Sequence, residues 1–183
     1  MLFSLRIRLF LIFSLIAGGF VAMMLNMKPV LSVGMWSISL ILIAGYLLFG
    51  TVNGALFMLN RAKVKEAEKL LAQTYKPEWL FKSHKAYYHF TKGLISLHKV
   101  NNTNVDESLY LAEGEDHLLK SLDLGLPRKQ ERAMAYLNLA AVALRKNNKD
   151  KAEEYYNGVK ENETENLRIQ KSLEDLEAAI KRM

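Results

Sequence analysis

The sequence contains no cysteine, which excludes disulfide bonds and thiolate metal sites and leaves the redox compartment open. Residues 1–60 contain no Asp or Glu, and their only charged side chains are Arg6, Arg8 and Lys28. Of the 25 Lys and Arg residues, 22 lie in residues 61–183, together with all 19 acidic residues. The net charge of +6 therefore reflects, in half, an apolar N-terminal region without acidic residues. It does not favour a nucleic-acid-binding protein.

The sequence also lacks the motifs of the common catalytic sites. It has no H-E-x-x-H segment, no phosphate-binding loop and no nucleophile elbow. No acidic residue follows any of the four histidines at the spacing of metal ligands; these are His84, His89, His98 and His117. Single histidines on amphipathic helices are usually structural or surface residues. We therefore expect no enzyme, no catalytic residues, no metal and no cofactor.

Two long apolar segments occupy the N-terminal third of the chain. Leu9–Leu25 is apolar apart from Ser14, and Leu31–Leu59 is apolar apart from scattered Ser, Thr and Asn53. A helix needs about 20 apolar residues to cross the hydrocarbon core of a bilayer. The short connection from Asn26 to Pro29 suits a tight turn. The sequence thus predicts a transmembrane helical hairpin in residues 1–60, with spans at about 7–27 and 31–55.

The positions of the basic residues predict the orientation of this hairpin. Arg6 and Arg8 precede the first span, a basic cluster follows the second span, and the turn carries only Lys28. Because cytoplasmic flanks are enriched in Lys and Arg, we expect an integral plasma-membrane protein with both termini in the cytoplasm. The alternative is a cleaved signal peptide with Leu9–Ile16 as its apolar region. The apolar character continues past Gly19 without a polar cleavage region, which favours a retained span.

Small residues in the two spans could let helices pack closely. Gly50 and Gly54 have the G-x-x-x-G spacing, and Gly18 and Ala22 form a similar pair in the first span. Such patches allow close approach of two helix backbones in a membrane. They either pack the two spans against each other or dock the membrane helix of a partner.

The segment from Arg132 to Glu161 contains two amphipathic helical patterns on either side of the polar turn Lys146–Asp150. The apolar and small residues recur every three or four positions: Ala133, Tyr136, Leu139, Ala140 and Ala143 in the first helix, and Ala152, Tyr156 and Val159 in the second. Ala140 and Ala152 allow the two helix backbones to approach, because the separation of helix axes depends on side-chain size.

This pattern resembles a tetratricopeptide repeat (TPR), a helix-turn-helix unit of about 34 residues. The residues at signature positions 4, 7, 8, 20 and 24 are Tyr136, Leu139, Ala140, Ala152 and Tyr156. Partial matches precede it: Ala67 and Leu71 fit positions 20 and 24 of a first unit, whose first helix would be the end of the second span. In the next unit Gly93 fits position 8, and Gly114, Leu118 and Ser121 fit positions 20, 24 and 27, with a nine-residue insertion between Gly93 and Gly114.

We expect an all-α fold in which a TPR-like array in residues 61–183 follows the hairpin. The helices are predicted at about 61–74, 83–99, 106–124, 129–146, 149–161 and 167–182. Ser83, Asp106 and Asn166 are candidate N-caps, and Gly125 is a candidate C-cap before Pro127. Trp79, Leu80 and Phe81 are expected to seal the joint between units. The last helix is expected to cap the array, which would otherwise expose an apolar face.

The resemblance to TPR proteins also implies a partner-binding groove. Carried onto this sequence, the groove positions are Tyr87, Phe90, Leu94, Leu97 and His98 in one unit, and Met134, Leu137, Ala141, Leu144 and Arg145 in the next. Eight of these are apolar, and the Lys, Asn and Arg set with which some TPR domains clamp a peptide carboxylate is missing. An apolar groove suits an amphipathic helix. The alternative is that the chain fills the groove itself, with the loop after Lys99 or with the last helix.

These patterns together predict a membrane-anchored scaffold that binds a protein partner, with neither a nucleic acid nor a small-molecule substrate. The partner would be an amphipathic helix or a subunit of a membrane complex. The alternative is a structural or assembly subunit that works mainly through its transmembrane helices, with the G-x-x-x-G patch as the contact. The sequence does not specify the partner, the pathway or the oligomeric state.

Overall fold

The computed structural model describes residues 5–49, 51–100, 107–162 and 165–182, and the regular structure within these ranges is entirely helical. This confirms the expected all-α fold class. The described helices are α1 (Leu5–Met24), α2 (Pro29–Phe49), α3 (Val52–Asn60), α4 (Val64–Ala72), a short 3-10 helix η1 (Pro77–Trp79), α5 (Lys82–Val100), α6 (Glu107–Asp123), α7 (Lys129–Arg145), α8 (Lys149–Glu161) and α9 (Leu167–Lys181).

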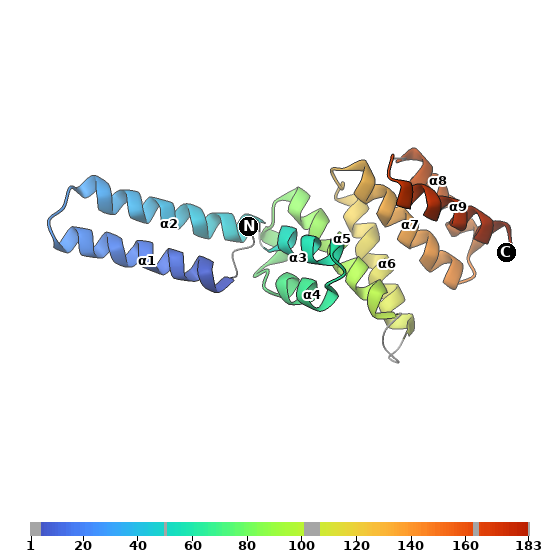
Figure 1. The fold of residues 1–183 in the computed structure, drawn as a ribbon, viewed down its shortest axis with the longest axis horizontal. Coiled ribbons are helices and arrows are strands. Elements are labelled where there is room, and N and C mark those ends of the chain that lie inside the picture. The colour runs from blue at the N-terminus through green and yellow to red at the C-terminus, as the bar shows by residue number, and fades with distance from the viewer. Residues whose placement is uncertain (1–4, 50, 101–106, 163–164, 183) are drawn as a thin grey trace.

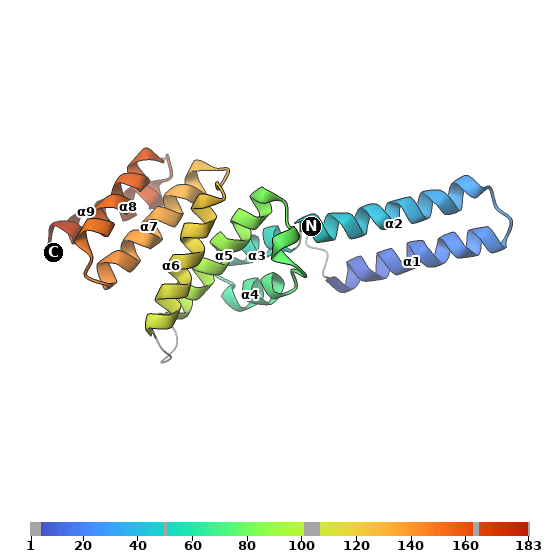
Figure 2. The same ribbon diagram turned by 180° about the vertical axis from the view of Figure 1, so that it is seen from behind.

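Helices α1 and α2 lie side by side and project from one end of a stack formed by α3 to α9 (Figure 1). The turn between them places Asn26 at a φ of 49° and is closed by a hydrogen bond from the Met27 amide to the Ala22 carbonyl at 3.0 Å. Pro29 begins α2, where its missing N–H is not needed. The opposite view shows the same separation between hairpin and stack (Figure 2).

Small and polar residues line the contact between α1 and α2. A Cβ atom added to Gly18 would lie 2.4 Å from Cε of Met35, and one added to Gly19 would lie 2.3 Å from Nε1 of Trp36. The hydroxyl of Ser39, which is also buried, donates to the Met35 carbonyl at 3.0 Å. The glycines thus let side chains of α2 rest directly on the backbone of α1, and the serine keeps its hydroxyl satisfied within its own helix.

One segment of the described chain, Pro29–Tyr46 in α2, is long and apolar enough to cross a membrane on length and composition. The corresponding apolar segment of α1, Leu9–Met24, is shorter than a span of this kind. The structure therefore supports one candidate span where the sequence predicted two.

The second apolar segment of the sequence does not form a single helix up to residue 55. Helix α2 ends at Phe49, and α3 begins at Val52 as a separate helix. Val52 and Ala55 are fully buried in a cluster that also contains Ala67, Leu71, Leu80 and Ile95. These apolar residues are therefore shielded by α4 and α5 rather than by lipid, and the hairpin is shorter than the predicted range 1–60. Hydrophobicity alone cannot distinguish these two environments.

The stack is built from helices that contact their neighbours along the chain. Helix α3 packs against α4 and α5, α5 pairs with α6, α6 meets α7, α7 pairs with α8, and α9 covers both α7 and α8. The central core includes the fully buried Phe90, Leu118, Leu126 and Leu139. Glycines allow the α5–α6 pair to close tightly, because a Cβ atom added to Gly93 would lie 3.1 Å from the Gly114 carbonyl oxygen. Ala140 and Ala152 are likewise fully buried in the core that α7 and α8 share.

Side-chain caps fix several helix ends. The Asn166 side chain accepts a hydrogen bond from the Arg168 amide at 3.0 Å, which confirms its role as the N-cap of α9. Gly125 follows α6 with a φ of 82°, as expected for a residue that ends a helix. Ser83 lies inside α5, which already begins at Lys82, so its prediction as an N-cap was wrong. Asp106 lies outside the described residues.

Candidate functional site

The residues of the expected groove occupy different environments. Phe90 is only 1% exposed and belongs to the central core, so it offers no surface to a partner. Ala141 is exposed on α7. The other six are half-buried beside the core: Tyr87, Leu94, Leu97, Met134, Leu137 and Leu144.

A pocket of about 100 Å³ brings groove residues of two successive helix pairs together. Leu97 of α5 and Ala141 of α7 both line it, and the remaining lining residues are Leu111, Asn138, Val142 and Arg145. The Asn138 amide donates to the Met134 carbonyl at 2.7 Å, and the Arg145 guanidinium lies 3.3 Å from the Glu107 carboxylate. The pocket thus has apolar walls with one amide and one cation at its edge.

The last helix covers a different part of the expected groove. Met134 and Leu137 pack against a cluster that contains the buried Ile169, with Leu173 beside it. Both of these contacts come from α9, which also contributes Leu176 and Ile180 to the central core. The apolar stripe on this helix therefore caps the end of the stack. It leaves the Leu97–Ala141 pocket as the described part of the groove that stays open.

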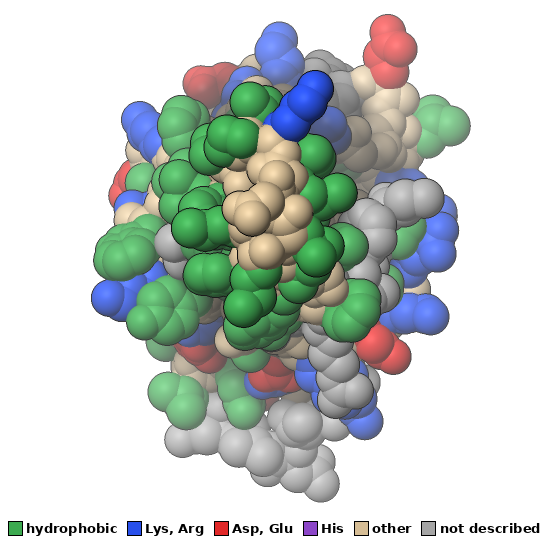
Figure 3. All heavy atoms as spheres, turned by 90° about the vertical axis from the view of Figure 1, so that its left-hand side faces the viewer, with side chains coloured by type: hydrophobic (Ala, Val, Ile, Leu, Met, Phe, Trp, Pro, Cys, Tyr) green, Lys and Arg blue, Asp and Glu red, His purple; other side chains and the backbone are tan. Residues whose placement is uncertain are grey.

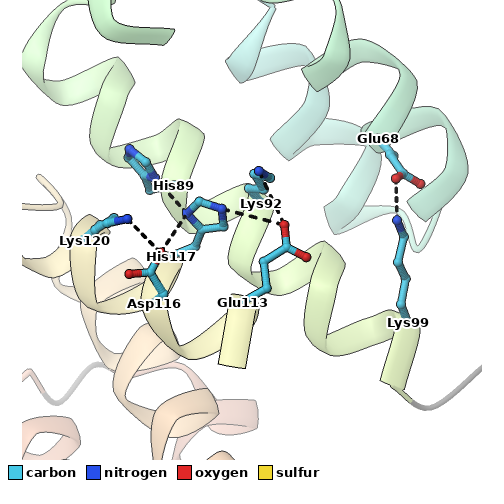
Figure 4. Close-up of polar contacts among 8 residues, drawn as sticks. All are labelled: Glu68, His89, Lys92, Lys99, Glu113, Asp116, His117 and Lys120. Carbon is cyan, nitrogen blue, oxygen red and sulfur yellow. Dashed lines mark hydrogen bonds and ion pairs between the residues drawn. The ribbon is translucent and has the colours of Figure 1, made fainter. Parts of the chain in front are cut away.

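A polar cluster lies between α5 and α6 (Figure 4). His89 of α5 and His117 of α6 face each other, with their Nδ1 atoms 3.0 Å apart. Nε2 of His117 lies 3.9 Å from the Glu113 carboxylate, which also pairs with Lys92 at 3.4 Å. A carboxylate near Nε2 favours the proton on that nitrogen, which leaves Nδ1 of His117 to accept from His89.

Burial and the neighbouring His117 lower the pKa of His89 to about 4. Burial also lowers the pKa of His117, with Lys92 nearby acting in the same direction. Both imidazoles are therefore neutral near pH 7 and can share one N–H···N hydrogen bond. Within the part of the chain that the structure describes, no three His, Cys, Asp or Glu side chains are grouped so as to hold a metal ion. This arrangement joins two helices and presents no nucleophile beside either base.

The residues predicted for packing in the membrane lie in two places. Gly18 and Ala22 belong to the hairpin, where Ala22 is 7% exposed and Gly18 lies under Met35. Gly54 is buried in α3, within the stack. Gly50 lies outside the described residues.

None of the protein-family models, curated proteins or solved structures compared with this chain matches it. What the chain does must therefore be inferred from its own geometry.

The sequence gave no indication of the contacts that join the hairpin to the stack. The Tyr46 hydroxyl of α2 donates to the Gln73 carbonyl, and the Thr51 hydroxyl donates to the Leu70 carbonyl and lies 3.2 Å from the Thr74 hydroxyl. The ring of Phe49 meets the His84 imidazole edge-on, with centroids 4.9 Å apart. Tyrosine and threonine in an apolar segment could have drawn attention, because buried hydroxyls require hydrogen-bond partners.

The joint between α4 and α5 also differs from the expectation. Leu80 is 4% exposed and seals the joint as predicted, but Trp79 and Phe81 are 51% and 60% exposed. The prediction for these two aromatic residues was wrong. η1 turns the chain so that only Leu80 points into the core.

Proposed function

We propose that this chain is a non-enzymatic, membrane-anchored scaffold. The α1–α2 hairpin holds a TPR-like helical stack at the cytoplasmic face of the plasma membrane, and the stack binds a helical segment of a protein partner. The observation that carries the proposal is the apolar surface of the hairpin. Its large side chains are exposed along both helices, for example Phe10 and Phe13 in α1 and Leu40 and Ile41 in α2, although the neighbouring stack buries its own apolar residues.

The dimensions of the hairpin support insertion of both helices. At 1.5 Å per residue, the 20 residues of α1 and the 21 of α2 each span about 30 Å, which is the thickness of the hydrocarbon core. The two helices pack against each other, so a bilayer that accepts α2 also receives α1. The ends of the hairpin that adjoin the stack then carry Arg6, Arg8 and the basic residues after α3, which favours a cytoplasmic stack.

The stack supports a TPR-like architecture through its paired helices and small contact residues. Gly93 with Gly114, and Ala140 with Ala152, are buried at the spacing of TPR signature positions 8 and 20. Ala55 and Ala67 have the same spacing of 12 residues and are also fully buried. This recurrence favours three helix pairs, α3–α4, α5–α6 and α7–α8, followed by α9 as a cap.

The Leu97–Ala141 pocket supports a protein partner over a small-molecule substrate. Its volume of about 100 Å³ is well below that of ordinary ligand sites, which hold roughly 300–1,000 Å³. A pocket of this size suits one apolar side chain from a helix laid across α5 and α7.

Site-specific crosslinking in native membranes tests this function. A photoreactive amino acid placed at Ala141 should give one adduct of defined mass, while the same group at Ala178, an exposed alanine on α9, should not. Ala141→Glu in chains labelled at a neighbouring exposed site should remove that adduct. Equal labelling at both alanines, or no adduct at Ala141, would contradict a partner site at the pocket.

The alternative, assembly through the membrane helices, has less support. Gly18 and Ala22 are already engaged within the hairpin, and Gly54 is buried in the stack, so a partner helix cannot reach these three residues without displacing internal contacts.

A further inference from the structure

Three aromatic side chains lie exposed where the hairpin meets the stack. Tyr75, Trp79 and Phe81 are 67%, 51% and 60% exposed. The Tyr75 and Trp79 rings meet edge-on with centroids 6.4 Å apart, and the Lys76 ammonium lies 4.5 Å above the Trp79 ring. Large exposed apolar groups of this kind usually mark a surface that is covered in the working protein.

The position of this surface relative to α2 identifies what covers it. The Phe81 amide donates a hydrogen bond to the Leu48 carbonyl at 2.8 Å, one residue before α2 ends. Because α2 is about as long as the hydrocarbon core is thick, Leu48 lies at the edge of that core when the helix spans a bilayer. Phe81, and with it η1, must then lie at the level of the lipid headgroups.

The chemistry of the segment suits that level. Tryptophan and tyrosine concentrate at membrane interfaces, where the ring is shielded and the N–H or O–H stays hydrated. Residues 75–85 carry Lys76, Lys82 and Lys85 against a single acidic residue, Glu78. Lysines at this depth attract anionic headgroups. Seen along the hairpin, the face of the stack around it carries hydrophobic side chains interspersed with Lys and Arg (Figure 3).

We propose that Tyr75, Trp79 and Phe81, with Lys76 and Lys82, form an interfacial collar that inserts into the anionic headgroup region of the bilayer holding the hairpin. This inference rests on the proposed membrane anchoring and adds a second contact between protein and lipid. Together with the hydrogen bonds at the end of α2, the collar fixes the stack at one height and orientation above the membrane. The partner pocket, farther along the stack, then faces the cytoplasm at a defined distance.

The chain has two tryptophans, which allow the collar and the hairpin to be tested separately. In Trp36→Phe, Trp79 is the only tryptophan; in Trp79→Phe, only Trp36 of α2 remains. Each full-length variant is reconstituted into vesicles of phosphatidylcholine and phosphatidylglycerol. Quenching is then compared between phosphatidylcholine brominated near the carbonyl groups and iodide in the water.

The collar predicts that Trp79 loses most of its fluorescence to the brominated lipid and little to iodide. It also predicts weaker lipid quenching of Trp79 in vesicles of phosphatidylcholine alone, because the lysines then lack anionic partners. Trp79 quenched by iodide and untouched by brominated lipid, while Trp36 is quenched by the lipid, would overturn the collar, leave the anchor intact and free this surface for a protein. Equal quenching of Trp79 in both vesicle types would remove the lysines from the proposal. If neither tryptophan responds to the lipid, the anchor itself fails and the collar fails with it.

Discussion

The backbone amide of Phe81 donates to the carbonyl of Leu48, 33 residues earlier in the chain, and this 2.8 Å hydrogen bond joins the stack to the last turn of α2. The last turn of a helix has carbonyl groups without partners in the helix, so the bond satisfies a group that would otherwise face the apolar boundary. With the hydroxyls of Tyr46 and Thr51, it makes the connection a packed joint rather than a linker.

Removing this amide should loosen the joint. Phe81→Pro deletes the donor at a position where proline fits, since Leu80 already has a ψ of 145°. The loss of one such hydrogen bond costs about 1 kcal/mol. Because the chain has no cysteine, spin labels can be placed at Lys28→Cys in the turn and Lys69→Cys on α4. The distance distribution between them should broaden in Phe81→Pro, while helicity stays the same.

Phe81→Ala is the matched control because it removes the ring and keeps the amide. In detergent its distance distribution should equal that of the parent. Broadening of equal size in both variants would show that the ring, and not the hydrogen bond, orders the joint.

The contact between α5 and α6 depends on the absence of a side chain at Gly93. In Gly93→Ala the new methyl group would lie 2.9 Å from Cγ of Leu118 and 3.1 Å from the Gly114 carbonyl oxygen, so the two helices must separate. We expect a loss of about 1–3 kcal/mol, as for other overpacked cores. Thermal unfolding of the full chain in mild detergent, followed by circular dichroism, should show a lower midpoint.

Gly45→Ala provides the reference for this experiment, since no atom lies within 4 Å of the added methyl group. Alanine there should be neutral or favourable because of its higher helix propensity. A Gly93→Ala midpoint as high as that of Gly45→Ala would contradict the close approach of α5 and α6.

Two neighbouring asparagines between α7 and α8 should respond oppositely to substitution. The Asn148 side chain caps α8 by accepting from the Lys151 amide at 3.1 Å, so Asn148→Ala should cost about 1 kcal/mol. Asn147 has a φ of 53°, a conformation that glycine adopts more easily. Asn147→Gly should therefore leave the unfolding midpoint unchanged or raise it. A lower midpoint for Asn147→Gly than for Asn148→Ala would argue against this geometry.

The His89–His117 pair should make stability depend on pH. Folding lowers the pKa of His89 from 6.5 to about 4, so between these values the unfolded chain binds the proton more tightly. The contribution is fully present above about pH 6.5 and is lost as the pH falls toward 4. Protonation would also bring His89 into repulsion with Lys92 and Lys120, opposed in part by Asp116.

Comparison with a variant isolates this contribution from other acids that titrate in the same range. His89→Gln should flatten the decline of the unfolding midpoint between pH 6.5 and 4. His98→Gln, on an exposed position of the same helix, should keep the slope of the parent. Identical slopes in all three chains would exclude the histidine pair as the source.

Much of the helical organisation could be predicted from the sequence. The helices from α5 to α9 begin and end within two residues of their predicted bounds because their apolar residues recur every three or four positions and polar turns separate them. Small residues at Gly93, Gly114, Ala140 and Ala152 correctly indicated where helix backbones approach.

The boundary between the hairpin and the stack could not be predicted. Val52 and Ala55 are as apolar as residues of a membrane span, and only the tertiary contacts with Ala67 and Ile95 show that protein covers them. Similarly, Phe90 and Ala141 hold equivalent places in the expected groove. Their exposure differs because α6 and α7 enclose one and not the other, and the sequence carries no local signal for this.

Protease accessibility across a sealed membrane tests most directly whether the hairpin anchors the stack at the cytoplasmic face. The stack is rich in trypsin sites, whereas the hairpin has one basic residue at its turn, Lys28. In right-side-out vesicles the stack should survive trypsin, and in inside-out vesicles it should be digested to a membrane-embedded hairpin. Digestion of the stack from the outer side, or recovery of the intact chain in the soluble fraction without detergent, would contradict the account.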